Sequence, residues 1–366
     1  MLFLNNSIPP LSGMTIPELT EALLKISKNN TIPPYRAKQI FSWIKNGAGN
    51  FRDMSSLPLS LIKALEENAI IRASTIKEMH KSSDGTIKLV MSLPNNALIE
   101  TVLLDSNLSK KSHFTACLST QAGCPLGCVF CKTGTMGFIR NLETSEIIEQ
   151  FLYLNDELKK SKGDQTDQKI SHIVVMGMGE PLLNLPSLRK ALELLCSPSG
   201  YCLSKRKITV STAGISSGII DLAENGPEIE LAVSISSADQ GLRSRLMPGL
   251  SRHPLSELKE ALVYYRKKTG RRITLEMVLL GGINTNPEDA RSLINFAKNI
   301  DVVINLIPWN PVKDLYFEGK RLKECSQKEI EKFTQMLESG GLAVTRRFRR
   351  GRSIAGACGQ LGINSG

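Results

Sequence analysis

The chain has 366 residues, of which 41% are hydrophobic and 22% are charged, with a formal net charge of +11 and a pI near 9.2. These values are typical of a globular protein, and no apolar run reaches the roughly 18 residues that cross a bilayer. The length allows one large core, or one core with a small accessory domain. The positive charge favours an anionic partner, with nucleic acid ahead of a membrane surface because no basic amphipathic helix stands out.

The first 75 residues are predicted to be helical. Apolar residues recur at helical spacing in three stretches, the first of which begins with a Thr-x-Pro-Glu start; they are 15–26, 35–47 and 55–69. The pattern then changes to alternating, strand-like runs at 77–93 and 97–106. We expect the first of these runs to turn back on itself at Asp84-Gly85.

From about residue 112, strand-like and helical patterns alternate to the end of the chain. Helical patterns such as 144–160 and 255–268 separate six β-rich runs, which are 113–120, 171–179, 206–212, 229–236, 271–280 and 302–310. Six strands with crossovers predict a parallel α/β sheet, either doubly wound or a full or partial barrel. In both architectures the ligand lies at the carboxyl ends of the strands.

Eight cysteines are too few and too unevenly spaced for a disulfide scaffold in a chain of this length. The N-terminal residues 1–14 have no basic flank and no small-residue cleavage site, so we expect a cytoplasmic protein whose clustered cysteines serve metal binding or catalysis. Cys124, Cys128 and Cys131 follow the first strand of the parallel series. Three thiolates on a four-iron cluster would leave one iron open for another ligand. The alternative is a closed zinc site, with Cys117 or a distant residue as its fourth ligand.

The spacing C-x3-C-x2-C, with Phe130 before the last cysteine, resembles the signature of radical S-adenosylmethionine (SAM) enzymes. This resemblance implies one [4Fe-4S] cluster held by Cys124, Cys128 and Cys131, with SAM on the fourth iron. It also implies a partial (β/α)6 barrel. Further collinear stretches resemble the RlmN branch of the RlmN/Cfr RNA methyltransferases; they are 35–44, 117–124, 177–184, 203–212, 305–311 and 357–361.

The RlmN/Cfr resemblance covers nearly the whole chain and implies a division into four parts. A helical accessory domain that contacts RNA would span 1–75, and a β-hairpin extension would span 76–111. The radical SAM core would span 112–350, and 351–366 would form a C-terminal loop that carries a methyl-accepting cysteine.

The chemistry that the resemblance implies is methylation of C2 of a specific adenine in 23S rRNA, with adenine 37 of tRNA left open as a second target. C2 of adenine is a poor nucleophile, and a thiolate is a better first acceptor for a methyl group. By resemblance, Cys358 accepts a methyl from one SAM, and a radical from a second SAM activates it for addition to the ring. Cys117 then releases the RNA through a disulfide with Cys358, and Glu100 is the proton acceptor.

Simpler explanations stay open for these side chains. Cys117 alternates along a strand, as a buried core cysteine would, and a glutamate such as Glu100 on the open face of a strand is common. The glycine-rich turn 177–181 is by itself weak evidence for a ligand site, because ordinary tight turns have the same composition.

The family's SAM contacts correspond to Gly179, Glu180, Ser211, Asn310 and the run Ser234-Ile235-Ser236. The chain departs from the family at Ser236, where a histidine is typical. A serine hydroxyl reaches less far than an imidazole and cannot stack, so the resemblance is weakest at this contact.

Two details favour the C2 branch over the related branch that methylates C8: Gly179-Glu180-Pro181 and Pro308-Trp309-Asn310. Both are associations of sequence, without a physical account of regiochemistry. The resemblance also implies a flavodoxin-type reductant, no membrane, a monomer, and action on 23S rRNA before the ribosome is fully assembled.

Basic runs at 204–207, 264–272 and 345–353 are candidates for RNA contact. The last lies directly before Cys358, and its arginines are expected to hold phosphates; they are Arg346, Arg347, Arg349, Arg350 and Arg352. A solvated basic face is the alternative. Two rival functions are a radical SAM enzyme acting on a small molecule, which needs neither Cys117 nor Cys358, and a zinc-stabilised RNA-binding protein.

Overall fold

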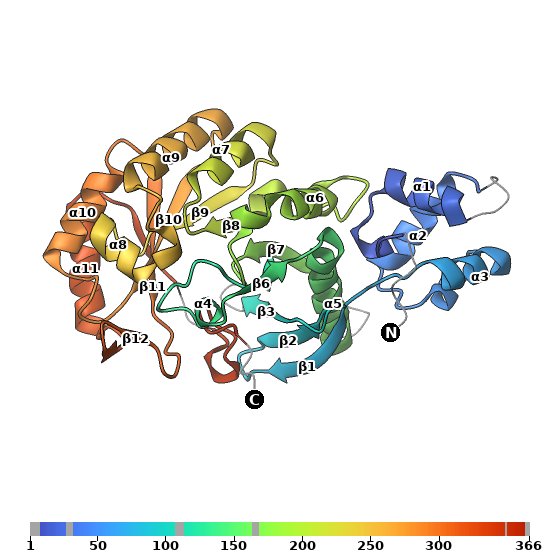
Figure 1. The fold of residues 1–366 in the computed structure, drawn as a ribbon, viewed down its shortest axis with the longest axis horizontal. Helices are drawn as coiled ribbons and strands as arrows, with labels where there is room; N and C mark the ends of the chain where they lie inside the picture. The colour runs from blue at the N-terminus through green and yellow to red at the C-terminus, as the bar shows by residue number, and fades with distance from the viewer. Residues whose placement is uncertain (1–7, 27–31, 107–112, 163–167, 348–349, 363–366) are drawn as a thin grey trace.

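A ten-stranded sheet forms the centre of the molecule in a computed structural model, which describes residues 8–26, 32–106, 113–162, 168–347 and 350–362 (Figure 1). The strand order is β1-β2-β3-β4-β7-β8-β9-β10-β11-β14. Strands β1 to β4 pair antiparallel, and every pair from β4 onward is parallel. The fold is therefore α/β with a mixed sheet, and among the described residues the sheet does not close into a barrel.

The six predicted parallel strands are confirmed. They are β4 (His113–Cys117), β7 (Ile170–Val175), β8 (Ile208–Thr212), β9 (Glu230–Ser234), β10 (Ile273–Leu279) and β11 (Val302–Pro308). A seventh parallel strand, β14 (Val344–Arg346), pairs with β11 and lies inside the basic run before Cys358. Sequence reasoning missed β14 because it has only three residues and carries no apolar run.

The antiparallel part of the sheet precedes the parallel part. It consists of β1 (Thr75–Lys81), β2 (Ile87–Ser92) and β3 (Leu98–Ser106), and β3 pairs with β4. The turn predicted at Asp84-Gly85 joins β1 to β2, and Gly85 has the positive φ of +82° that such turns favour in glycine. The region after residue 76 therefore continues the sheet of the core.

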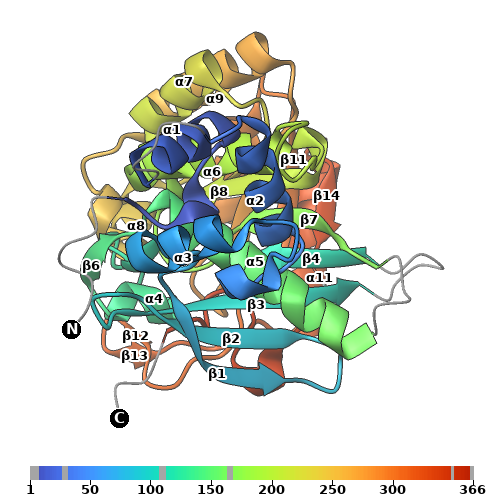
Figure 2. The same ribbon diagram turned by 90° about the vertical axis from the view of Figure 1, so that its right-hand side faces the viewer.

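Three N-terminal helices lie at one end of the molecule (Figures 1 and 2). They are α1 (Ile16–Ile26), α2 (Tyr35–Lys45) and α3 (Leu59–Asn68), and they confirm the three predicted helices. Thr15 caps α1: its N–H donates to Glu18 Oε2 at 2.8 Å, and the Glu18 N–H donates to Thr15 Oγ1 at 3.4 Å.

Buried Glu149 joins this end of the molecule to the core. It lies on α5 (Thr144–Lys162) and accepts hydrogen bonds from Ser12 Oγ at 2.8 Å, the Ala73 N–H at 2.9 Å and the Ser74 N–H at 2.8 Å. Ser12 precedes α1, and Ala73 and Ser74 follow α3. Glu149 therefore attaches both ends of the three-helix segment to α5 of the core.

The remaining long helices cover the outside of the parallel strands (Figure 1). They are α6 (Leu185–Cys196), α7 (Ser216–Asn225), α9 (Leu255–Thr269), α10 (Pro287–Ala297) and α11 (Gln327–Ser339). The shorter α8 (Gln240–Leu246) ends beside the cysteine loop, where the Val129 N–H donates to the Leu246 carbonyl at 3.0 Å. The predicted helices at 144–160 and 255–268 correspond to α5 and α9. In the described part of the chain, no helix combines the length and apolar character needed to cross a membrane.

Smaller elements complete the fold. A separate hairpin pairs β5 (Gln121–Gly123) with β6 (Phe138–Asn141), and β12 (Tyr316–Phe317) pairs with β13 (Lys320–Arg321). The short helix α4 (Lys132–Thr135) lies within the first hairpin.

Candidate active site

The cysteine loop connects β5 to α4 at the carboxyl end of the parallel strands. Local hydrogen bonds fold it: the Cys131 N–H donates to the Cys128 carbonyl at 3.1 Å, and the Cys124 N–H donates to the Gly137 carbonyl at 2.9 Å. A side chain on Gly134 would collide with the Cys128 backbone, with 2.7 Å to its oxygen, so a glycine is required there. The Trp309 indole N–H donates to the Phe130 carbonyl at 2.9 Å and ties the loop to the end of β11.

The three loop cysteines line one cavity together with most of the predicted SAM contacts. Its empty space is about 760 Å³, including the part open to solvent. The predicted residues on its wall are Cys124, Cys128, Cys131, Gly179, Glu180, Ser211, Ser234 and Cys358. Five separated stretches of the sequence thus contribute predicted residues to a single cavity.

The three thiols are not arranged as a mononuclear zinc site. Within the described ranges, no three His, Cys, Asp or Glu side chains are grouped so that they could hold one metal ion. The ligands of a four-iron cluster each bind a different iron and need not converge on one point. Burial raises the pKa of the Cys124 thiol to about 12, and it also raises the pKa values of Cys128 and Cys131. Because metals bind thiolates, a bound cluster would deprotonate these three thiols.

Glu180 is held rigidly at the cavity wall. Its Oε1 accepts from Thr212 Oγ1 at 2.6 Å and from the Leu182 N–H at 3.0 Å, and its Oε2 accepts from the Ala213 N–H at 2.7 Å. Burial raises the pKa of this carboxyl, and the three donors lower it. A carboxylate has about four lone-pair sites, so three donors leave room for one more, such as an ammonium group.

Gly179 allows the turn before Glu180 to pack against β5. Its φ is +100°, and a Cβ at this position would lie 2.5 Å from the Gln121 Cβ. The same Gln121 side chain accepts the Glu180 N–H at 2.8 Å. The glycine therefore has a packing reason as well as a place on the cavity wall.

Glu276 is a site residue that sequence reasoning missed. It is 3% exposed on β10, lines the cavity, and accepts from Ser211 Oγ at 2.8 Å. The sheet register places it between Ser234 on β9 and Asn305 on β11. The available signal was a lone carboxylate in the otherwise apolar run 273–280.

Three predicted contacts lie away from this cavity wall. Ile235 is fully buried in the core. Ser236 is also fully buried, with a φ of +53°, and its hydroxyl has no hydrogen-bond partner among the described residues. Asn310 lines a neighbouring pocket instead, where its Nδ2 donates to the Cys358 carbonyl at 3.1 Å.

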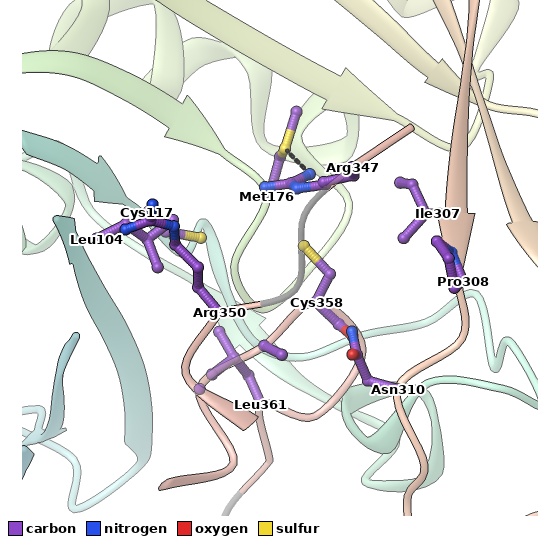
Figure 3. Close-up of a pocket in the computed structure, with 12 residues that line it drawn as sticks. Leu104, Cys117, Met176, Ile307, Pro308, Asn310, Arg347, Arg350, Cys358 and Leu361 are labelled. Atoms are coloured by element: carbon purple, nitrogen blue, oxygen red, sulfur yellow. Dashed lines mark hydrogen bonds between the residues drawn. The ribbon is translucent and has the colours of Figure 1, made fainter. Parts of the chain in front are cut away.

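Cys117 and Cys358 face each other across that neighbouring pocket (Figure 3). Cys117 is the last residue of β4, and Cys358 lies on the C-terminal loop. Both are free thiols in this structure, so the expected disulfide between them is not formed here. Burial and the nearby Cys358 raise the pKa of Cys117 to about 12, while Arg347 acts in the opposite direction.

Arg347 lies between the cavity of the three loop cysteines, called the SAM cavity below, and the pocket of Cys117 and Cys358, called the thiol pocket. It lines both of them, as do Met176, Ile307 and Cys358. Its guanidinium contacts Met176 Sδ at 3.3 Å and lies 3.7 Å from Glu276 Oε1. The negative charge of a Cys358 thiolate is the main cause that raises the Arg347 pKa, against burial.

The basic run before Cys358 is therefore divided in its orientation: Arg347 lines both cavities, and its contact with a phosphate stays a prediction. Arg346 is exposed and donates to Gln327 Oε1 at 3.2 Å, and Arg352 pairs with Glu324 at 3.4 Å. Arg350 lines the thiol pocket. Arg349 lies outside the described residues.

Glu100 lies on neither cavity wall. It is 3% exposed on β3, its Oε1 accepts from Lys88 Nζ at 2.8 Å, and its Oε2 accepts from the Gly362 N–H at 2.6 Å. Since Cys117 pairs with Val102 in the register, Glu100 is on the same face of the sheet as Cys117, two residues along β3.

Comparisons with known proteins agree with this geometry. Residues 118–297 match the family model described as the radical SAM superfamily. The chain is 45% identical over 352 residues to a probable dual-specificity RNA methyltransferase RlmN of Treponema denticola, which covers 96% of this chain and 95% of that protein. It is 40% identical over 353 residues to the dual-specificity RNA methyltransferase RlmN of Lawsonia intracellularis, with 96% of each protein covered.

A solved structure gives the same result for the fold. A radical SAM methyltransferase from Sphaerobacter thermophilus superposes with a TM-score of 0.88 at 34% identity, covering 97% of this chain and 99% of that one. Radical SAM enzymes use a [4Fe-4S] cluster and SAM, and both the cysteine loop and the cavity suit such groups. The chain belongs to the RlmN family of radical SAM RNA methyltransferases.

Proposed function

We propose that this enzyme methylates C2 of a specific adenine in 23S rRNA, and of adenine 37 in tRNA, through a methylated Cys358 and with two SAM per turnover. The observation that carries the proposal is the pair Cys117 and Cys358 in a pocket beside the cavity of the three loop cysteines. A radical SAM enzyme for a small molecule would need neither thiol. The relatives named dual-specificity support the second RNA substrate.

The residues present suit the cluster and SAM. Cys124, Cys128 and Cys131 would hold the cluster, and Gly179, Glu180, Ser211 and Ser234 would hold SAM. Asn310 Oδ1 is buried without a hydrogen-bond partner among the described residues, which suits a polar ligand beside Cys358. When bound, the cluster and SAM supply an electron, a methyl group and a 5′-deoxyadenosyl radical.

Cys358 carries the methyl group between the two halves of the reaction. Its thiolate would form a bond to the methyl carbon of SAM while the bond from that carbon to the SAM sulfur breaks and S-adenosylhomocysteine leaves. Arg347, which lines both cavities together with Cys358, offsets the negative charge of that thiolate beforehand. The methyl on Cys358 then gives a hydrogen atom to the 5′-deoxyadenosyl radical, and its carbon forms a bond to C2 of the adenine. The adduct loses the proton on C2 and one electron, which the cluster would accept. The Cys358 sulfur is now joined to the RNA, so a release step is required.

Cys117 performs this release. Its thiolate attacks the Cys358 sulfur, the bond from that sulfur to the methylene carbon breaks, and the carbon gains a proton to become the product methyl group. Because Cys117 is protonated at neutral pH in its buried position, it must lose a proton first. Glu100, on the same face of the sheet, is the proposed proton acceptor, and external reductant then reopens the disulfide.

A reconstitution experiment tests the proposal. The protein is loaded anaerobically with iron and sulfide and incubated with SAM, dithionite and 23S rRNA or tRNA, and the digested nucleosides are analysed by mass spectrometry. We expect 2-methyladenosine that depends on both SAM and reductant. A product of 8-methyladenosine would contradict the position of methylation, and SAM cleavage without modified RNA would contradict the substrate. Replacement of dithionite by flavodoxin tests the proposed electron donor, and sedimentation tests the proposed monomer.

A further inference from the structure

The C-terminal loop that carries Cys358 is held at both ends by the antiparallel strands. At its start, the Gly351 N–H donates to Asp84 Oδ2 at 2.8 Å, and Ser353 Oγ lies 2.8 Å from Ser82 Oγ. At its end, the Gly362 N–H donates to Glu100 Oε2 at 2.6 Å. Residues 351–362 therefore begin and end on β1–β3, although Cys358 faces the parallel strands.

The anchor at Gly362 is a buried ion pair. The side chains of Lys88 and Glu100 are 9% and 4% exposed, and the sheet register places Lys88 opposite Val102, which in turn lies opposite Cys117. A buried carboxylate without a counter-ion is costly, and Lys88 supplies that counter-ion to Glu100 while the other carboxylate oxygen accepts the Gly362 N–H. Lys88 itself lines neither cavity.

The anchor at Gly351 is a charged turn. Burial opposes the charge of Asp84, but hydrogen bonds led by the Gly351 N–H lower its pKa to about 2. Asp84 is therefore ionised throughout the physiological range and accepts a charge-assisted hydrogen bond from the loop.

The middle of the loop contacts the opposite side of the site. Asn310 Nδ2 donates to the Cys358 carbonyl at 3.1 Å, the Lys132 N–H donates to the Gly359 carbonyl at 2.8 Å, and Thr133 Oγ1 donates to the Leu361 carbonyl at 2.6 Å. These donors lie just after β11 and on α4, which follows the cysteine loop. Two groups of contacts therefore position Cys358. The first holds the ends of the loop on the antiparallel strands and their turn, and the second holds its middle on α4 and on the residues after β11. Only the second group belongs to the radical SAM core.

We propose that Asp84 and the Lys88–Glu100 ion pair are positioning residues for the methyl-carrying loop: they fix its two ends on β1–β3 and thereby hold the Cys358 sulfur at the SAM cavity. The proposal rests on the proposed function for what the loop carries. It goes beyond that function in assigning a role to Asp84 and Lys88, and to the strands that bear them.

The test uses the cluster-loaded enzyme with the substitutions Asp84→Asn and Lys88→Met. Two quantities are measured: the rate of Cys358 alkylation by iodoacetamide relative to exposed Cys202, and the rate of methyl transfer from SAM to Cys358. In both variants we expect alkylation to be about tenfold faster and methyl transfer at saturating SAM about tenfold slower, which corresponds to about 1.4 kcal/mol. The SAM concentration for half-maximal rate should stay within about twofold, because neither residue lines the SAM cavity.

Matched variants separate positioning from a general loss of structure. Lys77→Met makes the same substitution on the neighbouring strand at an exposed site and should change neither rate. Lys88→Arg keeps the charge and should restore most of the methyl transfer. Asp84 lies in a turn, so Asp84→Asn carries the test if Lys88→Met fails to fold.

Unchanged alkylation and methyl transfer in Asp84→Asn would overturn the proposal, as would slower methyl transfer without faster alkylation. Failure of the proposed function is distinguishable from both. If the unaltered enzyme never methylates Cys358, the proposed function is wrong, while the alkylation rates still report whether β1–β3 hold the loop.

Discussion

The cysteine loop and the thiol pocket both present sulfur atoms, but they are built in different ways. Cys124, Cys128 and Cys131 come from one short stretch and are folded by hydrogen bonds within that stretch and to the adjoining hairpin. Cys117 and Cys358 come from the end of β4 and from the C-terminal loop, and they meet only because the sheet and the loop anchors bring them together. We therefore expect the cluster site to tolerate changes elsewhere that disable the thiol pocket.

Cys358→Ala is expected to have the largest effect on RNA methylation while leaving the cluster site intact. Methylation of RNA should fall by at least about 10⁴-fold, as expected when a covalent nucleophile is removed. Iron and sulfide content, and SAM cleavage, should remain, because the loop cysteines are untouched. The measurement is nucleoside mass spectrometry with iron analysis, and Cys202→Ala is the control at an exposed cysteine. Retained methylation would contradict the role of Cys358.

Cys117→Ala separates the roles of the two thiols within the thiol pocket. Cys358 should still become methylated and attach to the RNA, but the attachment should not be released, since no second sulfur can attack. A covalent protein–RNA adduct should accumulate to about one per enzyme and be visible on a denaturing gel. The half-buried Cys196→Ala is the control. Normal turnover, or absence of any adduct, would show that Cys117 is a core cysteine.

Arg347→Met tests the residue that the two sites share. Removal of the guanidinium should slow methyl transfer to Cys358 by about 10- to 100-fold, because a hydrogen bond or contact to a charged group contributes about 1.5–3 kcal/mol. Cluster content should be unchanged. Arg346→Met alters the exposed neighbouring arginine and should leave the rate of methyl transfer intact. Equal rates for both variants would exclude an electrostatic role of Arg347.

The smallest effect is expected for Ser236→Ala. The Ser236 hydroxyl is fully buried without a partner among the described residues, so its removal should change the free energy of unfolding by no more than about 1 kcal/mol. SAM affinity, measured by calorimetry, should change by less than about twofold. A tenfold loss of affinity would instead support Ser236 as the SAM contact that the family resemblance implies.

The misplaced residues show what pattern reading lacks. The resemblance implies Ser234, Ile235 and Ser236 as contacts of one ligand, but β9 ends at Ser234, which lines the cavity. Ile235 and Ser236 follow the strand, and the chain turns at Ser236 with a φ of +53°, so that both side chains are buried away from the cavity. Arg347 was grouped with its basic neighbours, whereas the backbone after β14 turns it inward. Glu276 was overlooked because no single strand reveals which residue lies beside it across the sheet.

Pattern reading alone predicts the six parallel strands, the three N-terminal helices and the cysteine loop. Each of these depends on spacing between near neighbours, which hydrophobic periodicity and local hydrogen bonds fix. The folded structure is needed to see that Cys358 faces Cys117 and that Arg347 and Glu276 lie on the cavity wall with Cys358. It is also needed to see that Asp84 and Glu100 accept hydrogen bonds from the two ends of the loop. Those contacts join residues far apart along the chain, and their geometry depends on strand order and register, which no local pattern encodes.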